Sequence, residues 1–179
     1  MFPEVTFEEY LAAEAASTVR HEWVAGQVYA MVGASERHEL MAGLVYQALI
    51  PVAAERGCRL FIGNRKVRLG EAVYYPDVVM VCPGGRAPDR LFEWDLSIVV
   101  EVLSESTRRI DRREKAMAYA AAPSFERYLL VDPDRRRIEV AALGPKGLNW
   151  VVYIGGQTVP ELDLDVDSLH DSLDATALT

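Results

Sequence analysis

The sequence predicts an α/β (α+β) fold in which helices pack against a mixed β-sheet. The first observation is the order of elements, because from residue 36 the pattern runs helix, three strands, helix, strand. The second is the segment SIVVEVL at 97–103, whose only charge is Glu101; such an apolar run is expected of a strand covered on both faces. The third is the segment 36–55, where apolar residues recur every three to four positions, as in a helix with one core-facing side.

A short helix and a hairpin are expected before this core. Thr6 is a candidate N-cap, and Glu9 follows it three residues later, which is the capping-box pattern of a helix start. The segment 20–33 carries aromatic and β-branched residues on both sides of Ala25-Gly26. It therefore predicts two antiparallel strands joined by a tight turn.

The long helix has a clear start and an interior proline. Ser35 is its candidate N-cap, and the helix is expected to run to about Glu55. Pro51 should kink or shorten its last turn, because proline lacks the backbone N–H. Residues of the expected core-facing stripe are Leu40, Leu44 and Ala48, with Met41 and Val45 beside them.

Strand patterns follow the long helix, interrupted by one further helix. Gly63-Asn64 is a turn or bulge signal within the first strand region, and Pro123 ends the second helix, expected to begin at about Ser104. The last two strands read as a hairpin around Gly144-Pro145. The expected strands are 58–63 with 65–69, 73–82, 96–103, 126–132, 136–143 and 149–154, and a short turn or helix is expected near residue 168.

Composition excludes several classes of protein. A length of 179 residues fits one domain over 1–179, with its core at about 36–132. The longest apolar runs are far shorter than the ~20 residues of a membrane span, and the N-terminus does not resemble a secretion signal. Cys58 and Cys82 are too few for a disulfide framework, so we expect two buried free thiols and a cytoplasmic protein. His21 and His170 are expected at the surface.

Charge is unevenly distributed along the chain. The formal net charge is −8, which argues against a protein covered with basic residues. An acidic tail at 161–179 holds six acids and no lysine or arginine, so the other 160 residues carry only −2. The segment 106–137 has nine basic residues against five acids. It is either a basic face or a set of solvated helix and turn positions.

Two acids lie where burial is expected, Asp77 in YYPDVVMV and Glu101 in IVVEVL. A buried lone carboxylate costs several kcal/mol, so a cation, a metal or hydrogen-bond donors should lie nearby. Carboxylates on neighbouring strands suit a hard cation such as Mg²⁺. The alternative is that Asp77 caps the turn at Pro76 and that Glu101 pairs with a core arginine.

These residues resemble a known family. The segments YPDVVMVC, SIVVEVLSEST and DRREKAMAYAAAPSFERYLLVD are similar to the restriction-endonuclease-like family of bacterial proteins within the PD-(D/E)xK nuclease superfamily. The resemblance extends over roughly residues 5–170 and includes the N-terminal hairpin with its Ser-x-x-His helix start. It implies a restriction-endonuclease-like core of helix, three strands, helix, strand.

The resemblance also implies a metal site and its residues. Asp77 matches the Pro-Asp motif aspartate and Glu101 the second motif acid, so both would bind Mg²⁺ or Mn²⁺, with the carbonyl of Val102 as a further ligand. The motif lysine is expected two residues after Glu101, but Leu103 stands there. Lys115, in DRREK on the next helix, resembles a migrated catalytic lysine; the alternative is an exposed lysine paired with Asp111.

Four further residues are candidates for substrate binding. Glu22 resembles the family's N-terminal acid, and His38 resembles its helix histidine; the alternatives are a water-facing edge charge and a structural histidine. Arg108 and Arg112 flank Lys115 and are expected to contact phosphates, in which case binding weakens steeply with salt.

The resulting hypothesis is a metal-dependent endonuclease that hydrolyses DNA, acting as a homodimer because both strands of a duplex must be cut. A second hypothesis is a catalytically inactive homodimer that binds nucleic acid or acts as a scaffold, since Leu103 replaces the motif lysine. A third is a two-carboxylate glycosidase, which needs no metal. The sequence indicates no protein partner and no membrane association.

Overall fold

The computed structural model describes residues 4–31, 33–84, 91–104 and 108–176. Within these ranges the strands form a six-stranded sheet of order β11-β10-β9-β8-β6-β3, a five-stranded sheet of order β2-β1-β5-β4-β7 and the pair β12-β13. The strands are β1 (His21–Val24), β2 (Gln27–Ala30), β3 (Arg59–Ile62), β4 (Lys66–Leu69), β5 (Ala72–Tyr74), β6 (Val78–Val81), β7 (Phe92–Glu93), β8 (Ile98–Val102), β9 (Arg127–Asp132), β10 (Arg137–Gly144), β11 (Gly147–Ile154), β12 (Thr158–Val159) and β13 (Leu164–Asp165). The helices are α1 (Phe7–Ala16), α2 (Glu36–Glu55), α3 (Arg108–Ile110), the π-helix η1 (Asp111–Lys115), α4 (Ala116–Ala120), the 3₁₀-helix η2 (Pro160–Leu162) and α5 (Val166–Thr176).

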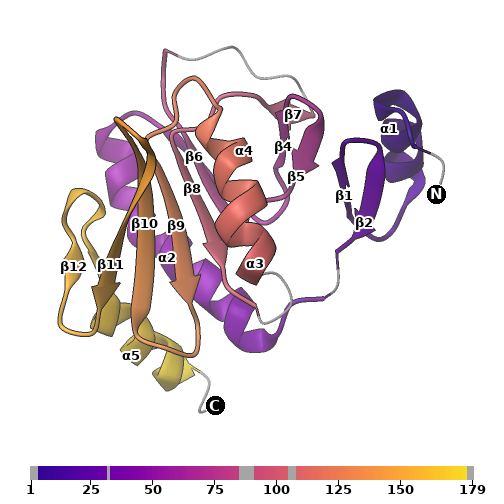
Figure 1. Cartoon of the computed structure of the whole chain (residues 1–179). Coiled ribbons are helices and arrows are strands. Elements are labelled where there is room, and N and C mark those ends of the chain that lie inside the picture. Colours follow the sequence, from indigo (N-terminus) through magenta and orange to yellow (C-terminus); the bar gives the residue numbers. More distant parts are fainter. Residues whose placement is uncertain (1–3, 32, 85–90, 105–107, 177–179) are drawn as a thin grey trace.

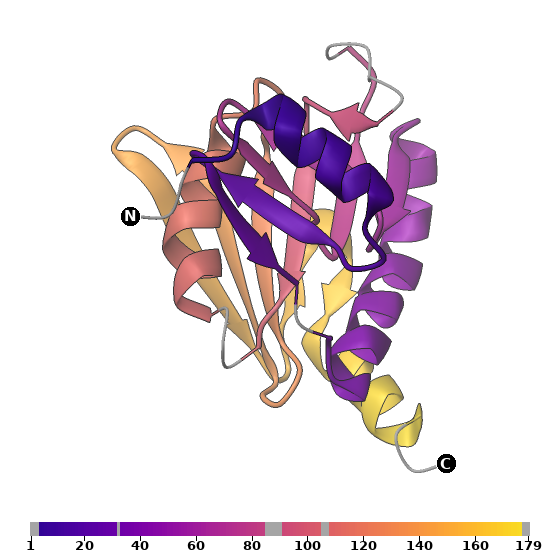
Figure 2. The same ribbon diagram turned by 90° about the vertical axis from the view of Figure 1, so that its right-hand side faces the viewer.

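The six-stranded sheet lies between two layers of helix. Figure 1 shows α3 and α4 in front of β8 and β9, with α2 behind, and Figure 2 shows the same layers from the side. The sheet is mixed, because β8 and β9 are parallel whereas β3, β6 and β8 pair antiparallel. The order α2, then β3, β6 and β8, then the α3–α4 helix, then β9 confirms the predicted α/β core.

Each face of this sheet has its own apolar core. Alternate strand residues such as Val78 and Val100 pack against α2 and α5, while Val79 and Val99 pack against α4 and the strands β4 and β5. Burial on both faces explains why the strand β8 is almost free of polar residues.

The long helix begins and ends as predicted. The Ser35 side chain accepts the His38 backbone N–H, and the helix continues through Pro51 to Glu55. Its most buried positions are Met41, Val45 and Leu49, one residue away from the predicted stripe, and Leu40 and Leu44 pack at its border.

The N-terminal helix and hairpin were also predicted correctly. Thr6 and Glu9 form both hydrogen bonds of a capping box, and β1 and β2 turn at Ala25-Gly26. Figure 2 shows α1 lying across this hairpin. Tyr10 and Trp23 are buried between the helix and the five-stranded sheet.

The expected strand 73–82 is divided in two. Val73 and Tyr74 belong to β5 in the five-stranded sheet, whereas β6 begins at Val78 in the six-stranded sheet. Pro76 lies at the break, where its missing N–H makes continued pairing unfavourable. Asp77 is consequently placed where the chain enters the six-stranded sheet.

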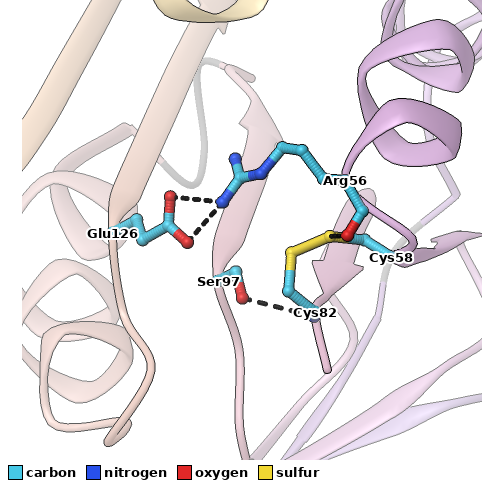
Figure 3. Close-up of a disulfide and its surroundings, with 5 residues drawn as sticks. All are labelled: Arg56, Cys58, Cys82, Ser97 and Glu126. Carbon is cyan, nitrogen blue, oxygen red and sulfur yellow. Dashed lines mark hydrogen bonds and ion pairs between the residues drawn. A yellow bond between two sulfur atoms is a disulfide. The ribbon is translucent and has the colours of Figure 1, made fainter. Parts of the chain in front are cut away.

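The prediction of two free buried thiols is wrong. Cys58 and Cys82 form a disulfide with a Cα–Cα distance of 4.1 Å (Figure 3). They extend the β3–β6 ladder by one position beyond the pair Arg59–Val81, so the strand register places them opposite each other. Both are half-buried, beside the Arg56–Glu126 ion pair that Figure 3 also shows.

The acidic tail is largely held against the fold. Arg136 pairs with Asp167 and Asp171 of α5. The expectation that His170 lies at the surface is wrong, since it is 3% exposed on the inner side of this helix. None of the helices in the described ranges is long and apolar enough to cross a membrane.

Candidate active site

Asp77 and Glu101 face each other at one end of the six-stranded sheet. In the antiparallel ladder of β6 and β8, Val78 lies opposite Val100. One position further along, the same register places Asp77 opposite Glu101, on the sheet face that carries α4. Directly opposed residues have Cβ atoms about 4.5–5.5 Å apart, so the two carboxylates lie close together.

Lys115 reaches Glu101 from the neighbouring helix. Its Nζ lies 3.0 Å from Glu22 Oε1, 3.2 Å from Glu101 Oε1 and 3.5 Å from Asp111 Oδ1. The side chain is buried, so it is not the solvent-exposed lysine of the alternative interpretation, although it does pair with Asp111. It ends a π-helical turn, and Tyr128 donates a hydrogen bond of 3.0 Å to the Asp111 carbonyl within that turn.

Asp77 is held by two further groups. One carboxylate oxygen lies 3.0 Å from His38 Nε2, and the other accepts the Val102 backbone N–H at 2.7 Å. The other His38 nitrogen, Nδ1, is buried and has no hydrogen-bond partner among the described residues. The structure thus brings together Asp77, Glu101, Lys115, Glu22, His38 and the Val102 backbone.

Two residues of the site were not predicted from sequence. Tyr119 is fully buried and donates a hydrogen bond of 2.7 Å to the Glu101 oxygen that also contacts Lys115. Asp111 was considered only as a helix partner of Lys115, but it lies inside the site. The spacing of the residues could have indicated Tyr119, because it follows Lys115 by four residues and therefore shares its side of the helix.

The electrostatics of these residues are dominated by excess negative charge. We refer to the following residues as the carboxylate cluster: Glu22, His38, Asp77, Glu101, Asp111 and Lys115. Burial raises the pKa of Glu101 well above its usual range, and the other carboxylates add to this effect against the opposing charge of Lys115. Burial alone would lower the pKa of Lys115, but the Glu101, Glu22 and Asp111 carboxylates raise it. The ammonium is therefore charged at neutral pH.

His38 is shifted toward its protonated form. Burial lowers the pKa of this imidazole, but the hydrogen bond and the charge of Asp77 outweigh burial and raise it. A histidine with a raised pKa next to a carboxylate carries positive charge over more of the neutral range. It therefore offsets part of the negative charge around Asp77.

The donor set fits a hard divalent cation that is completed by other ligands. Among the described residues, no group of three or more His, Cys, Asp or Glu side chains could hold a metal ion alone. Mg²⁺, however, is usually bound through one or two carboxylates together with water and substrate phosphates. Asp77 and Glu101 supply two carboxylates of this kind, in surroundings with more acids than cations.

Arg108 and Arg112 are not part of the carboxylate cluster. Arg108 donates two hydrogen bonds of 3.1 Å to Asp132, and Arg112 pairs with Glu139. Both acceptor carboxylates are buried. These arginines hold the helix against β9 and β10, and their contact with substrate stays a prediction.

Similarity to known proteins shows the family of this chain. The Uma2 family model, described as "Putative restriction endonuclease", matches residues 7–174. This chain belongs to the Uma2 family. The uncharacterized protein slr1290 from Synechocystis sp. is 30% identical over 176 residues, which cover 97% of this chain and 91% of the relative. The uncharacterized protein sll1609 from the same organism is 27% identical over 139 residues, covering 75% and 78% of the two chains.

A solved structure shares the Uma2 chain's fold. It is described as a putative nuclease belonging to DUF820 from Anabaena variabilis, and it superposes with a TM-score of 0.78. The match covers 94% of this chain and 99% of that chain at 16% sequence identity. The predicted restriction-endonuclease-like fold is thereby confirmed.

Proposed function

We propose that this chain is a Mg²⁺- or Mn²⁺-dependent endonuclease that hydrolyses phosphodiester bonds of DNA. Asp77 and Glu101 would hold the cation, and the carbonyl of Val102 would be a further ligand. When bound, such a cation lowers the pKa of a water ligand and neutralises charge on the phosphoryl oxygen. Support comes from the family, whose model is described as "Putative restriction endonuclease", and from the geometry of the carboxylate cluster.

The remaining residues of the cluster position reactive groups. The Lys115 ammonium lies 3.2 Å from Glu101 and is placed to orient the attacking water and to offset charge on the phosphate. Tyr119 holds the Glu101 carboxylate, and His38 holds that of Asp77. Glu22 contacts Lys115 and steadies its ammonium next to the metal ligands.

One observation carries this proposal. A lysine is missing at position 103, where Leu103 is buried among apolar side chains, yet an ammonium still reaches the motif glutamate. Lys115 reaches it from the following helix, where it is the last residue of the π-helical turn. The contact between Lys115 and Glu101 supports a role for this lysine in phosphodiester hydrolysis.

The test is a nuclease assay on plasmid DNA with Mg²⁺, with Mn²⁺ and with EDTA. Asp77→Asn and Glu101→Gln are expected to lose at least about 100-fold in cleavage rate, because loss of an indirect metal partner alone typically costs 10–100-fold. Glu114→Gln is the matched control, since Glu114 is an exposed acid next to Lys115, and it should cleave at the wild-type rate. Normal cleavage by either Asp77→Asn or Glu101→Gln would refute the assignment of the site.

The same assay separates the competing hypotheses. Plasmid cleavage that persists in EDTA would refute the metal dependence, whereas a glycosidase would leave the plasmid intact under every condition because it hydrolyses glycosidic and not phosphodiester bonds. DNA binding without cleavage under any metal would favour the inactive homodimer. Only metal-dependent cleavage that requires Asp77 and Glu101 fits the proposal.

A further inference from the structure

Tyr29 on β2 is an aromatic residue that the fold leaves exposed. Its exposed fraction is 54%, whereas every other tyrosine, tryptophan and phenylalanine in the described ranges is buried or half-buried. Within the same ranges its hydroxyl forms no hydrogen bond, and its ring contacts no other ring or cation. A flat and largely apolar ring is therefore available to a ligand.

The register of the N-terminal hairpin places Tyr29 beside the carboxylate cluster. Tyr29 lies directly opposite Glu22 in the β1–β2 ladder, so both side chains project from the same face of the sheet. This face is turned toward the cluster, because Glu22 Oε1 lies 3.0 Å from Lys115 Nζ. Trp23 points to the other face, where it packs with Tyr10 of α1. Opposed residues have Cβ atoms about 4.5–5.5 Å apart, so Tyr29 is an immediate neighbour of a cluster residue.

Exposure to solvent increases from the inside of the cluster toward Tyr29. The Glu101 side chain is 6% exposed, and that of Glu22 is 15% exposed. Tyr29 follows at 54%, on a strand that forms one edge of the five-stranded sheet. Tyr29 therefore lies at the outer rim of the site, within reach of a substrate segment that flanks the reacting bond.

A second tyrosine beside Glu22 shows that the fold does not require this exposure. Continued by one position, the β1–β5 register places Tyr74 opposite Glu22, on the side away from Tyr29. Tyr74 is buried, and its hydroxyl donates a hydrogen bond of 3.2 Å to Glu114. Packing and hydrogen bonding thus account for Tyr74, but neither accounts for Tyr29.

The charge around Tyr29 favours a nucleobase over a phosphate as its ligand. Its neighbour across the ladder is the carboxylate of Glu22, and the carboxylate cluster holds more acids than cations. A phosphate at Tyr29 would meet this negative charge, whereas a nucleobase is uncharged. Bases stack well on tyrosine rings, and the contact tolerates any base because every base has a π face.

We propose that the Tyr29 ring stacks on a nucleobase of the substrate, next to the phosphate that lies at Asp77 and Glu101. This inference rests on the proposed function and specifies its substrate class. A base that stacks on a side chain has left the stack of its own duplex. The preferred substrate is therefore single-stranded DNA, or DNA with unpaired bases near the scissile bond.

The test is binding of a single-stranded oligonucleotide that contains 2-aminopurine, a fluorescent base whose emission is quenched when it stacks on a ring. The full chain is titrated in EDTA and, separately, with Ca²⁺, a hard cation that takes oxygen ligands. Tyr29→Ala should lose about 5- to 140-fold in affinity, the range expected for one stacked base. The quenching seen with the wild type should be lost as well.

Three comparisons separate stacking from other effects. Tyr29→Phe keeps the ring and should keep the wild-type affinity and quenching. Val28→Ala changes the adjacent exposed residue on the opposite face of β2, and it should bind like the wild type. The wild type should bind a fully paired duplex of the same sequence more weakly than the single strand, and Tyr29→Ala should reduce this difference.

Four results would overturn the proposal: unchanged affinity and quenching in Tyr29→Ala, an equal loss in Tyr29→Phe, equal wild-type affinity for duplex and single strand, or no single-strand binding by the wild type. The proposed function fails independently of these results. If Tyr29→Ala loses binding but no metal supports cleavage, the nucleobase contact stands and the nuclease assignment falls. If cleavage requires Asp77 and Glu101 but Tyr29→Ala binds like the wild type, the nuclease assignment stands and the nucleobase contact falls.

Discussion

Removal of the Lys115 ammonium should destabilise the protein strongly, because three carboxylates depend on it. Lys115→Met keeps most of the side-chain volume but leaves Glu22, Glu101 and Asp111 without the cation that lies 3.0–3.5 Å from each. Loss of one partner from a buried ion pair typically costs 3–5 kcal/mol. We therefore expect the free energy of unfolding to fall by about 3–5 kcal/mol at pH 8.

The loss should depend on pH in a defined direction. Burial raises the pKa of Glu101, so this group is more easily protonated in the folded state than in the unfolded state. An acid whose pKa is raised in the folded state lowers the free energy of unfolding as pH rises above its pKa in the unfolded state. Protonation of the acid removes this loss of stability. Lys115→Met should therefore be less destabilising at pH 5 than at pH 8.

Urea denaturation followed by circular dichroism measures both effects. Arg113→Met is the matched control, because this exposed cation lies two residues away, and its change should stay within about 0.5 kcal/mol. The double variant Glu101→Gln/Lys115→Met should recover about 1–3 kcal/mol of the loss, as expected for residues in contact. A loss below about 1 kcal/mol in Lys115→Met would refute the view that its ammonium compensates buried carboxylates.

Three further predictions concern stability. Reduction of the Cys58–Cys82 disulfide, which spans 24 positions, should lower the free energy of unfolding by up to about 3 kcal/mol in urea titrations, and a double serine variant should not respond to reductant. Burial lowers the pKa of His170, so the free energy of unfolding should fall as pH drops below about 6.5, the pKa of histidine in the unfolded state. In His170→Gln, the free energy of unfolding should differ less between pH 7.5 and pH 5.5 than in the wild type. Thr6→Ala removes the capping box and should cost about 1 kcal/mol by thermal denaturation, whereas an unchanged melting temperature would show that α1 does not depend on its cap.

Local patterns in the sequence predicted the core elements well. The capping residues Thr6 and Ser35 marked helix starts because a side-chain oxygen near free backbone N–H groups is a local requirement. Asp77 and Glu101 stood out because acids inside apolar strands need compensation, and the structure places them opposite each other.

Features that depend on strand register were not predictable in the same way. Alternation along one strand shows which residues share a face, but not which residue of another strand lies opposite, so the Cys58–Cys82 pair was missed. The division of the strands into two sheets was missed for the same reason, since the pattern of 73–82 does not show that its two halves pair with different strands.

The sequence also did not show which residues pair with long side chains. Arg108 and Arg112 looked available for substrate because their acceptors, Asp132 and Glu139, come from strands that follow later in the chain. Tyr119 was not singled out from the sequence, because its hydroxyl meets Glu101 only through contact between distant elements.

The metal site is tested most directly by isothermal titration of Mn²⁺ into EDTA-treated protein, with and without a DNA duplex. Wild type and Glu114→Gln should bind Mn²⁺ alike, while Asp77→Asn and Glu101→Gln should lose at least about 10-fold in affinity. A metal site at Asp77 and Glu101 would be contradicted if Asp77→Asn and Glu101→Gln both bound Mn²⁺ as tightly as the wild type. It would also be contradicted if the wild type bound no Mn²⁺ even with DNA present.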